Sequence, residues 1–322
     1  MNKRKTAACI AFFLFALCGS AWAHHPTGVS GPGHSGPLRT LSAISIEQGR
    51  IPVEVDTEFI DLDSFSDQQL LQFAAEGKNV HSANSILHSS LGIGYGVTNE
   101  LSIGLRIPYV RVNNIREAHA DEPEEIHIHG DSKGIGDMTL LMQYMFLKMT
   151  ESRPAMAVFF GVKIPTGKTN VKDVGGERFE TEFQPGSGAW DPIAGTAITK
   201  RFGSLSLDVS FLYTLSTRGA QATRLGDSFQ YNAAASYRTF RSNGFSGDLI
   251  LEANGEWRQK QKTAGITDEN SGENVIFISP GMRLSWKQWS AYVSVGLPIV
   301  QDLKGIQNKT NTKTLFGVTV GF

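Results

Sequence analysis

The sequence predicts an all-β protein, a single transmembrane antiparallel β-barrel of about twelve strands with short periplasmic turns and long outer loops. Three observations lead to this prediction. The chain begins with an export signal, many of its segments alternate apolar and polar residues, and the links between those segments alternate between short and long. Little of the chain shows the 3.6-residue period of an amphipathic helix.

The first element is a secretory signal peptide over residues 1–23. Basic residues precede an apolar run over residues 7–17, and Ala21 and Ala23 supply the small residues of a cleavage site. That run is shorter than the roughly 20 residues that a helix needs to cross a bilayer. We therefore expect cleavage near Ala23 and a location in the outer membrane of a Gram-negative bacterium.

Cysteine usage and charge exclude several classes of site and partner. Cys9 and Cys18 both lie in the signal peptide, so the mature chain can form no disulfide and offers no thiolate to a metal. Cleavage removes three of the 30 Lys and Arg residues and none of the 31 Asp and Glu residues, leaving 27 against 31. This net charge of −4, with His neutral, argues against nucleic acid as a partner.

The N-terminal segment, residues 24–49, precedes the first strand on the periplasmic side. Its first half is too rich in glycine and proline for regular structure. It can fold into the lumen of the barrel as a plug, or it can be a disordered leader. His24 and His25 bring an amine and two imidazoles together, which are ligands that suit copper or nickel.

The barrel itself is expected over residues 50–322. Its twelve strands, each about 10 to 13 residues long, suit tilted strands that cross a bilayer. They are expected to begin near Ile51, Ile86, Leu101, Asp137, Ala155, Trp190, Leu205, Ser228, Ser246, Asn274, Trp289 and Thr312. Pro192 and Pro280 fall inside two of them and predict bulges, or misplaced strands, at those points.

The links between the strands sort by length. The short ones are residues 98–100, 150–153, 201–204, 239–245 and 286–288, and the long ones are residues 61–85, 113–136, 166–189, 217–227, 259–273 and 300–311. A soluble β-sandwich is the alternative, but it need not sort its loops in this way and rarely has strands this long. In the first long link, Ser66 and Gly77 bound a short helix whose apolar residues could cover an entrance to the barrel.

Alternation along the strands assigns each side chain to lipid or to the lumen. Aromatic residues near strand ends predict the two interfacial girdles: Tyr109, Tyr144, Phe146, Tyr213, Tyr237, Trp257, Trp286 and Trp289. By the same parity the lumen receives Glu54, Asp56, Glu58, His88, Arg106, Asp137, Lys163, Asp208, Arg238, Asp248, Glu252, Glu256, Arg258, Arg283 and Lys313. We expect most of these charges to pair across strands, with no clear preference for one sign.

Two further segments suggest partners. The chain ends on Phe322, and a terminal strand of this kind resembles the signal by which the barrel-assembly machinery recognises outer-membrane proteins. The acidic segment 119–129 places His127 and His129 on one face if it is extended. That face could bind divalent cations that bridge lipopolysaccharide, although a solvated acidic loop is the simpler interpretation.

No catalytic residues are expected. His88 and Ser90 share a strand face, but parity directs both into the lumen, whereas an outer-membrane lipase needs its serine and histidine on the lipid side. The sequence therefore predicts neither an enzyme nor a cofactor.

Three glycine-rich runs carry a resemblance to a known family: Gly136 to Leu140, Gly161 to Gly167, and Gly186 to Pro192. Their order and spacing resemble the meta-pathway phenol-degradation family of outer-membrane β-barrels, and more distantly the channels for fatty acids and toluene. The resemblance implies a transporter for small solutes, with hydrophobic or aromatic compounds among them. Two alternatives stay open, namely a metal-binding barrel and a non-conducting structural barrel.

Overall fold

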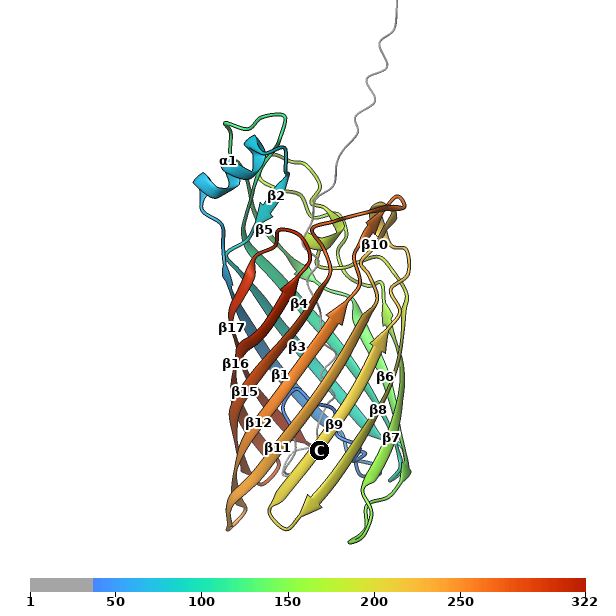
Figure 1. Cartoon of the computed structure of the whole chain (residues 1–322). Helices are drawn as coiled ribbons and strands as arrows, with labels where there is room; N and C mark the ends of the chain where they lie inside the picture. Colours follow the sequence, from blue (N-terminus) through green and yellow to red (C-terminus); the bar gives the residue numbers. More distant parts are fainter. Residues whose placement is uncertain (1–36) are drawn as a thin grey trace, which may run out of the picture.

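Twelve antiparallel strands form a closed, tilted barrel in the computed structural model, which describes residues 37–322 (Figure 1). The strands are β1 (Pro52–Asp63), β3 (Ser85–Gly96), β4 (Leu101–Ala118), β6 (Met138–Leu147), β7 (Ala155–Ile164), β8 (Asp191–Phe202), β9 (Leu205–Thr214), β11 (Ser228–Ser242), β12 (Phe245–Arg258), β15 (Glu273–Trp286), β16 (Trp289–Leu303) and β17 (Lys309–Gly321). Each pairs with its neighbour in this order, and β17 pairs with β1, with Val318 opposite Val55. The signal peptide, His24 and His25 lie outside the described residues.

The predicted barrel is confirmed in strand number and position. Every strand begins within three residues of its expected start, the largest difference being Lys309 against Thr312. The short turns gather at one end, which we call the periplasmic end, and the longer connections gather at the other, the outer end (Figure 1). None of the helices in the described part of the chain is long and apolar enough to cross a membrane.

The long loop expected over residues 113–136 is instead largely strand. β4 continues to Ala118, and β5 (His127–Ile135) pairs with it, so residues 113–136 are not a single loop. The Asp131 carboxylate holds this pair together, because it accepts from Asn114 N–H at 3.0 Å and lies 2.6 Å from Arg111. Together with β2 (Val80–Ser82), residues 113–118 and β5 project beyond the barrel as a structure that we call the outer finger.

The loop expected over residues 300–311 is likewise shorter, because β16 runs to Leu303 and β17 begins at Lys309. The Gln301 side chain replaces missing ladder bonds here: it donates to Thr310 O at 3.1 Å and accepts from Thr310 N at 2.8 Å. Side-chain amides that mimic backbone partners in this way are not visible in a hydrophobic pattern.

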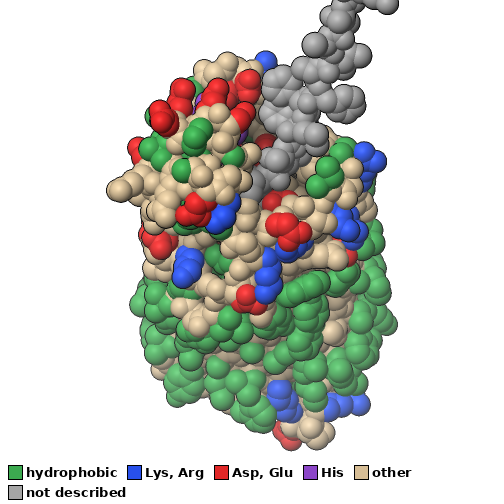
Figure 2. All heavy atoms as spheres, turned by 45° about the horizontal axis from the view of Figure 1, so that its top comes forward, with side chains coloured by type: hydrophobic (Ala, Val, Ile, Leu, Met, Phe, Trp, Pro, Cys, Tyr) green, Lys and Arg blue, Asp and Glu red, His purple; other side chains and the backbone are tan. Residues whose placement is uncertain are grey.

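On the face shown in Figure 2, an apolar belt covers the barrel between two more polar ends. The eight aromatic residues expected in the girdles are all exposed, from 37% for Tyr109 to 53% for Tyr237. Leu249, Leu251, Val295 and Phe316 are exposed between them. This surface suits lipid, because the outward face of a membrane barrel is apolar with aromatic residues at both interfaces.

The two strand prolines behave differently. Pro192 is the second residue of β8, its carbonyl accepts from Leu215 N–H at 2.9 Å, and no register shift occurs there. The expected bulge at Pro192 is therefore wrong. At Pro280 the pairing of β15 with β16 is interrupted over residues 279–280 while its register is kept, because proline has no N–H to donate.

The predicted short helix is α1 (Asp67–Ala75), capped by a reciprocal pair of bonds between Ser66 and Gln69. Its buried residues Leu70 and Ala74 pack against Val80 and Ala118 of the outer finger. The helix therefore supports the finger and does not cover an entrance. Short elements β10 (Thr223–Arg224), β13 (Lys262–Thr263), β14 (Ile266–Thr267), η1 (Thr181–Phe183) and η2 (Ala220–Ala222) occupy the other outer loops.

Candidate functional site

Residues 37–49 form an extended segment that crosses the inside of the barrel. Its backbone N–H groups bind lumen-facing side chains of several strands: Leu38, Arg39 and Thr40 bind Glu252 at 3.0–3.1 Å, Leu41 binds Ser210 at 3.2 Å, Ala43 binds Thr199 at 2.8 Å, and Ile46 binds Ser102 at 2.8 Å. Gly49 then binds Gly96 O at 2.8 Å, at the periplasmic end of β3. The segment thereby contacts strands on opposite sides of the lumen.

Charged groups fix the start of this lumen segment. Arg39 forms a buried ion pair with Glu58. Arg283 donates to the carbonyl of Pro37 at 2.8 Å. Beside them Tyr292 donates to Glu54 at 2.6 Å, so Glu54 and Glu58 of β1 are satisfied from β16 and from the segment itself.

The structure places every residue of the predicted lumen set on the inner side of the barrel or at its rim, buried or nearly so. Many of them pair: Arg106 with Asp56 at 2.9 Å, Arg238 with Asp248 at 2.8 Å, Lys163 with Asp191 at 2.6 Å, and Arg258 with Glu256. His88 lines the lumen, and Ser90 donates to Asp56 at 2.7 Å, so neither side chain faces lipid.

A cavity of about 700 Å³ lies in the lumen among the described residues. Its lining mixes charged, amide and apolar side chains: Arg39, Glu58, His88, Arg106, Gln230, Asn232, Asn254, Glu256, Val275, Phe277, Ser279, Gly296, Lys313 and Leu315. The ammonium of Lys313 lies 4.2 Å from the centre of the Phe277 ring, a cation–π contact. The cavity therefore offers an apolar patch beside both signs of charge.

The loop between β7 and β8 packs into the outer end of the barrel. Phe179 and Phe183 of this loop are buried against Ile86 and Val110 of the barrel wall and Ile115 of the outer finger. The loop thus narrows the outer end, while the lumen segment lies nearer the periplasmic end.

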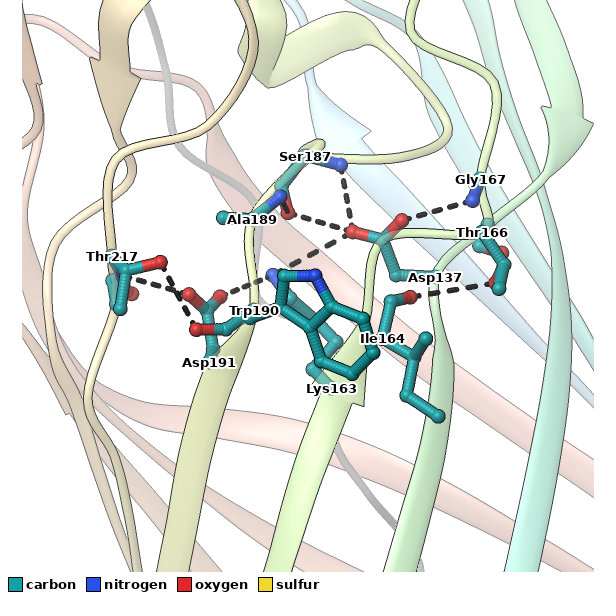
Figure 3. A network of polar contacts seen from close by, with 12 residues as sticks. Asp137, Lys163, Ile164, Thr166, Gly167, Ser187, Ala189, Trp190, Asp191 and Thr217 are labelled. Carbon is teal, nitrogen blue, oxygen red and sulfur yellow. Dashed lines mark hydrogen bonds and ion pairs between the residues drawn. The ribbon is translucent and has the colours of Figure 1, made fainter.

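A polar network at the rim fastens the β7–β8 loop (Figure 3). One carboxylate oxygen of Asp137 accepts from Gly167 N–H at 3.0 Å, and the other accepts from the N–H and hydroxyl of Ser187 at 2.7 and 2.6 Å. Lys163 lies between this group and Asp191, which in turn accepts from Thr217 N–H at 2.7 Å. The network therefore joins the connection that leads into β6, the β7–β8 loop and the connection that follows β9.

The glycines of this rim are needed for close approach of two backbones. A Cβ atom on Gly167 would lie 2.6 Å from the Gly186 Cα atom, and one on Gly186 would lie 2.6 Å from Gly167. Backbone atoms cannot move aside as a flexible side chain does, so both positions require glycine. The runs Pro165-Thr166-Gly167 and Gly186-Ser187-Gly188 therefore meet at the rim, where they shape the turns.

The outer finger carries a second polar cluster. His81 and Glu117 are direct partners across β2 and β4, with Nε2 2.8 Å from Oε2, and His129 Nε2 lies 3.6 Å from the same oxygen. His129 Nδ1 binds Asp173 at 2.8 Å. Glu180 and Glu182 of the β7–β8 loop lie against His81 on its other side.

Burial and charge shift the titration of this cluster. Burial lowers the pKa of His81, but the adjacent Glu117 carboxylate outweighs it and raises the pKa to about 10. Burial raises the pKa of Glu180 to about 7 and that of Glu182 well above its usual range. This cluster therefore brings buried carboxyl groups, Glu180 and Glu182 among them, close together without a positive side chain for each.

The two histidines predicted from this region separate in the structure. His129 joins the buried cluster, whereas His127 Nε2 lies 3.1 Å from Glu122 and its ring packs on His119 at 4.7 Å. Sequence reasoning missed His81 and Glu117, which lie in two different segments that were expected to be loops. It also missed Arg39, Tyr292 and Asp191, whose partners lie on distant strands.

Closed strand order, an apolar outer belt and a charged lumen define the class of outer-membrane-type β-barrels. Within that class, the sequence matches a family described as "Putative MetA-pathway of phenol degradation" over residues 83–300, and the chain belongs to this family. No curated protein matches the sequence.

Solved structures with a similar fold include an outer-membrane channel from Pseudomonas putida F1, with 15% sequence identity and a TM-score of 0.61, covering 87% of this chain and 98% of that chain. At this identity the likeness concerns the fold alone. The β domain of the Bordetella autotransporter BrkA has 10% identity, a TM-score of 0.47, and coverage of 86% and 100%. The CymD monoaromatic hydrocarbon channel has 11% identity, a TM-score of 0.42, and coverage of 86% and 89%.

Proposed function

We propose that this protein is an outer-membrane channel through which small solutes diffuse. The observation that carries the proposal is the cavity of about 700 Å³ inside a closed barrel, lined by both charged and apolar side chains. A barrel with a merely structural role would not need a lumen of this kind, because side chains can fill a smaller ring of strands.

Hydrophobic or aromatic compounds are the solutes that this lining fits best. Val275, Phe277 and Leu315 supply an apolar wall, while Lys313 and Arg39 supply positive charge on its edge. The family description, which refers to phenol degradation, agrees with a small aromatic solute.

The lumen segment acts in this proposal as a plug that must move for solutes to pass. Glu252 accepts bonds from three consecutive N–H groups of the segment, and together with the Arg39–Glu58 ion pair and the Arg283 contact to Pro37 it holds the start in place. Beyond this start, the segment is held by single hydrogen bonds, most of them to or from side chains. Such a mixture allows release without unfolding of the barrel, whose ladder bonds do not involve the segment.

Planar-bilayer conductance tests the channel. We expect the purified mature protein to give brief, infrequent openings, and a form lacking residues 24–46 to give long-lived openings of higher conductance. The exposed change Asp302→Asn serves as a control and should behave like the wild-type protein, since the Asp302 side chain forms a solvent-exposed ion pair with Lys304 at the outer end. Absence of current from both the full and the shortened chains would refute the channel.

Solute preference is tested in liposomes. Uptake of a benzoate-type aromatic acid should exceed that of a neutral sugar of similar size, and Phe277→Ser should reduce aromatic uptake several-fold while sugar uptake stays the same. Equal loss for both solutes would leave a channel without aromatic preference, and so would overturn only this finer part of the proposal.

A further inference from the structure

The outer finger and the adjoining residue His119 supply four of the five histidines in the described part of the chain. Two of them, His119 and His127, lie at its outer edge, and two, His81 and His129, face inward around Glu117. The inward group is separate from the lumen cavity, whose only histidine is His88.

We propose that His81, Glu117 and His129 bind a divalent transition-metal ion, with zinc as the ion that fits them best. One ligand atom from each residue lies within 4.8 Å of the others. Four-coordinate zinc takes nitrogen and carboxylate oxygen at about 2.0–2.2 Å, so its ligands need to be only a few ångströms apart. Two imidazoles and one carboxylate, with a position left for water, make such a set.

The surroundings of His129 match those of a metal ligand. Its Nδ1 atom faces the Asp173 carboxylate at 2.8 Å, while its buried Nε2 atom lies 3.6 Å from Glu117, beyond hydrogen-bond length, and makes no hydrogen bond to the described residues. A carboxylate that binds one ring nitrogen fixes the tautomer in which the other nitrogen is free to coordinate. Asp173 is thus a positioning residue in this proposal.

An unpartnered carboxylate oxygen supplies a second indication. Glu182 is 7% exposed, its Oε2 accepts from Gln261 at 2.7 Å, and its Oε1 has no hydrogen-bond partner in the described part of the chain. Glu182, Glu180 and His81 form another group whose ligand atoms lie within 4.8 Å of one another. Buried carboxylates are costly unless positive charge compensates them, and a metal ion bound beside His81 would add such charge to this cluster.

The cluster favours zinc over calcium or magnesium, because those ions prefer oxygen ligands and full carboxylate cages. Phe183 packs 5.0 Å from the His81 ring and forms a dry wall on one side. The side chain of His129 is 20% exposed, which leaves a route for the ion. The competing interpretation is a simple ion pair between His81 and Glu117 with no metal.

Zinc titration by calorimetry separates these interpretations. The test uses the mature chain in detergent, stripped with a chelator, with His24→Ala and His25→Ala introduced so that the N-terminus cannot bind. We expect one zinc ion per chain. His81→Ala and His129→Ala should each weaken binding by more than about 100-fold, and Asp173→Asn by about 10- to 100-fold. His127→Ala, on the same strand, is the matched control and should leave the affinity unchanged.

Cobalt substitution adds a readout that a structural defect alone would not produce. Cobalt bound by two imidazoles and a carboxylate should give the visible absorption of a low-coordinate site. This absorption should vanish in Glu117→Gln, while heat-dependent gel mobility shows that the barrel of the variant is still folded. The proposal is overturned if the stripped protein takes up no zinc, if the His81 and His129 variants bind as tightly as the parent, or if His127→Ala costs as much as His129→Ala.

Discussion

Glu252, in the middle of β12, accepts a hydrogen bond from the backbone N–H of Thr40 at 3.0 Å, although the two residues are 212 positions apart. The same carboxylate binds the N–H groups of Leu38 and Arg39. Three consecutive amides that converge on one carboxylate resemble an anion-binding nest, in which the ligand is a side chain of the barrel wall. This contact orders the start of the lumen segment.

Replacing Glu252 with glutamine should loosen that segment. Glutamine keeps one acceptor oxygen but turns an NH₂ group toward the remaining amide, and hydrogen bonds to a charged acceptor are worth about 1.5–3 kcal/mol against 0.5–1.5 kcal/mol for neutral ones. We expect hydrogen exchange at residues 38–40 to accelerate by about tenfold or more. Glu256→Gln, on the same face of β12 and paired with Arg258, is the control. Unchanged exchange in Glu252→Gln would show that the carboxylate does not hold the segment.

Gly167→Ala should displace the β7–β8 loop from the rim. Its Cβ atom would meet backbone atoms of Gly186 and Gly136 at 2.6–2.7 Å, and overpacking of this kind costs about 1–3 kcal/mol. We expect faster cleavage within residues 168–185 in limited proteolysis. Gly175→Ala, in the same loop, meets only Asp173 at an ordinary 3.4 Å and should be cleaved like the wild type. Similar rates for both variants would contradict the close-approach argument.

The barrel was predictable because its signal is local. A period of two along a strand fixes which side chains face inward, so the positions of Glu54, Arg106 and Asp208 follow from their own neighbours in sequence. Strand starts follow for the same reason, since turn residues bound each alternating run. Where a strand continued beyond the membrane, as β4 does, the apolar face weakens and the pattern no longer distinguishes strand from loop.

The candidate sites were only partly predictable because they depend on contacts between distant segments. His81 and Glu117 meet through the register of β2 on β4, which no local pattern specifies. Residues 37–49 could be read as a plug or a leader, because their partners Ser210 and Glu252 lie more than 160 positions away. His129 was identifiable by residue type, but its partners were not.

Depth in the membrane should govern the cost of a charge on the outer face. Val295 lies mid-way along β16 and faces lipid, whereas Ile299 faces lipid nearer the outer end. Arginine at mid-depth of a membrane barrel costs about 2–4 kcal/mol and near an interface about 0–1 kcal/mol. Denaturant unfolding in lipid vesicles should therefore show a larger loss of unfolding free energy for Val295→Arg than for Ile299→Arg. Equal losses would argue that this face does not contact lipid.

The C-terminal residue allows assembly to be separated from stability. The Phe322 ring is 66% exposed, and its backbone exchanges two hydrogen bonds of 3.0 Å with Ile51, which close the barrel at its seam. Phe322→Ser keeps both backbone bonds, so we expect the refolded variant to unfold within about 0.5 kcal/mol of the wild type, as exposed substitutions usually do. If the assembly machinery reads the terminal ring, however, the amount inserted into outer membranes in cells should fall several-fold. Equal insertion of the two proteins would contradict a recognition role for Phe322, whereas a parallel loss of refolded stability would assign the ring to packing at the seam.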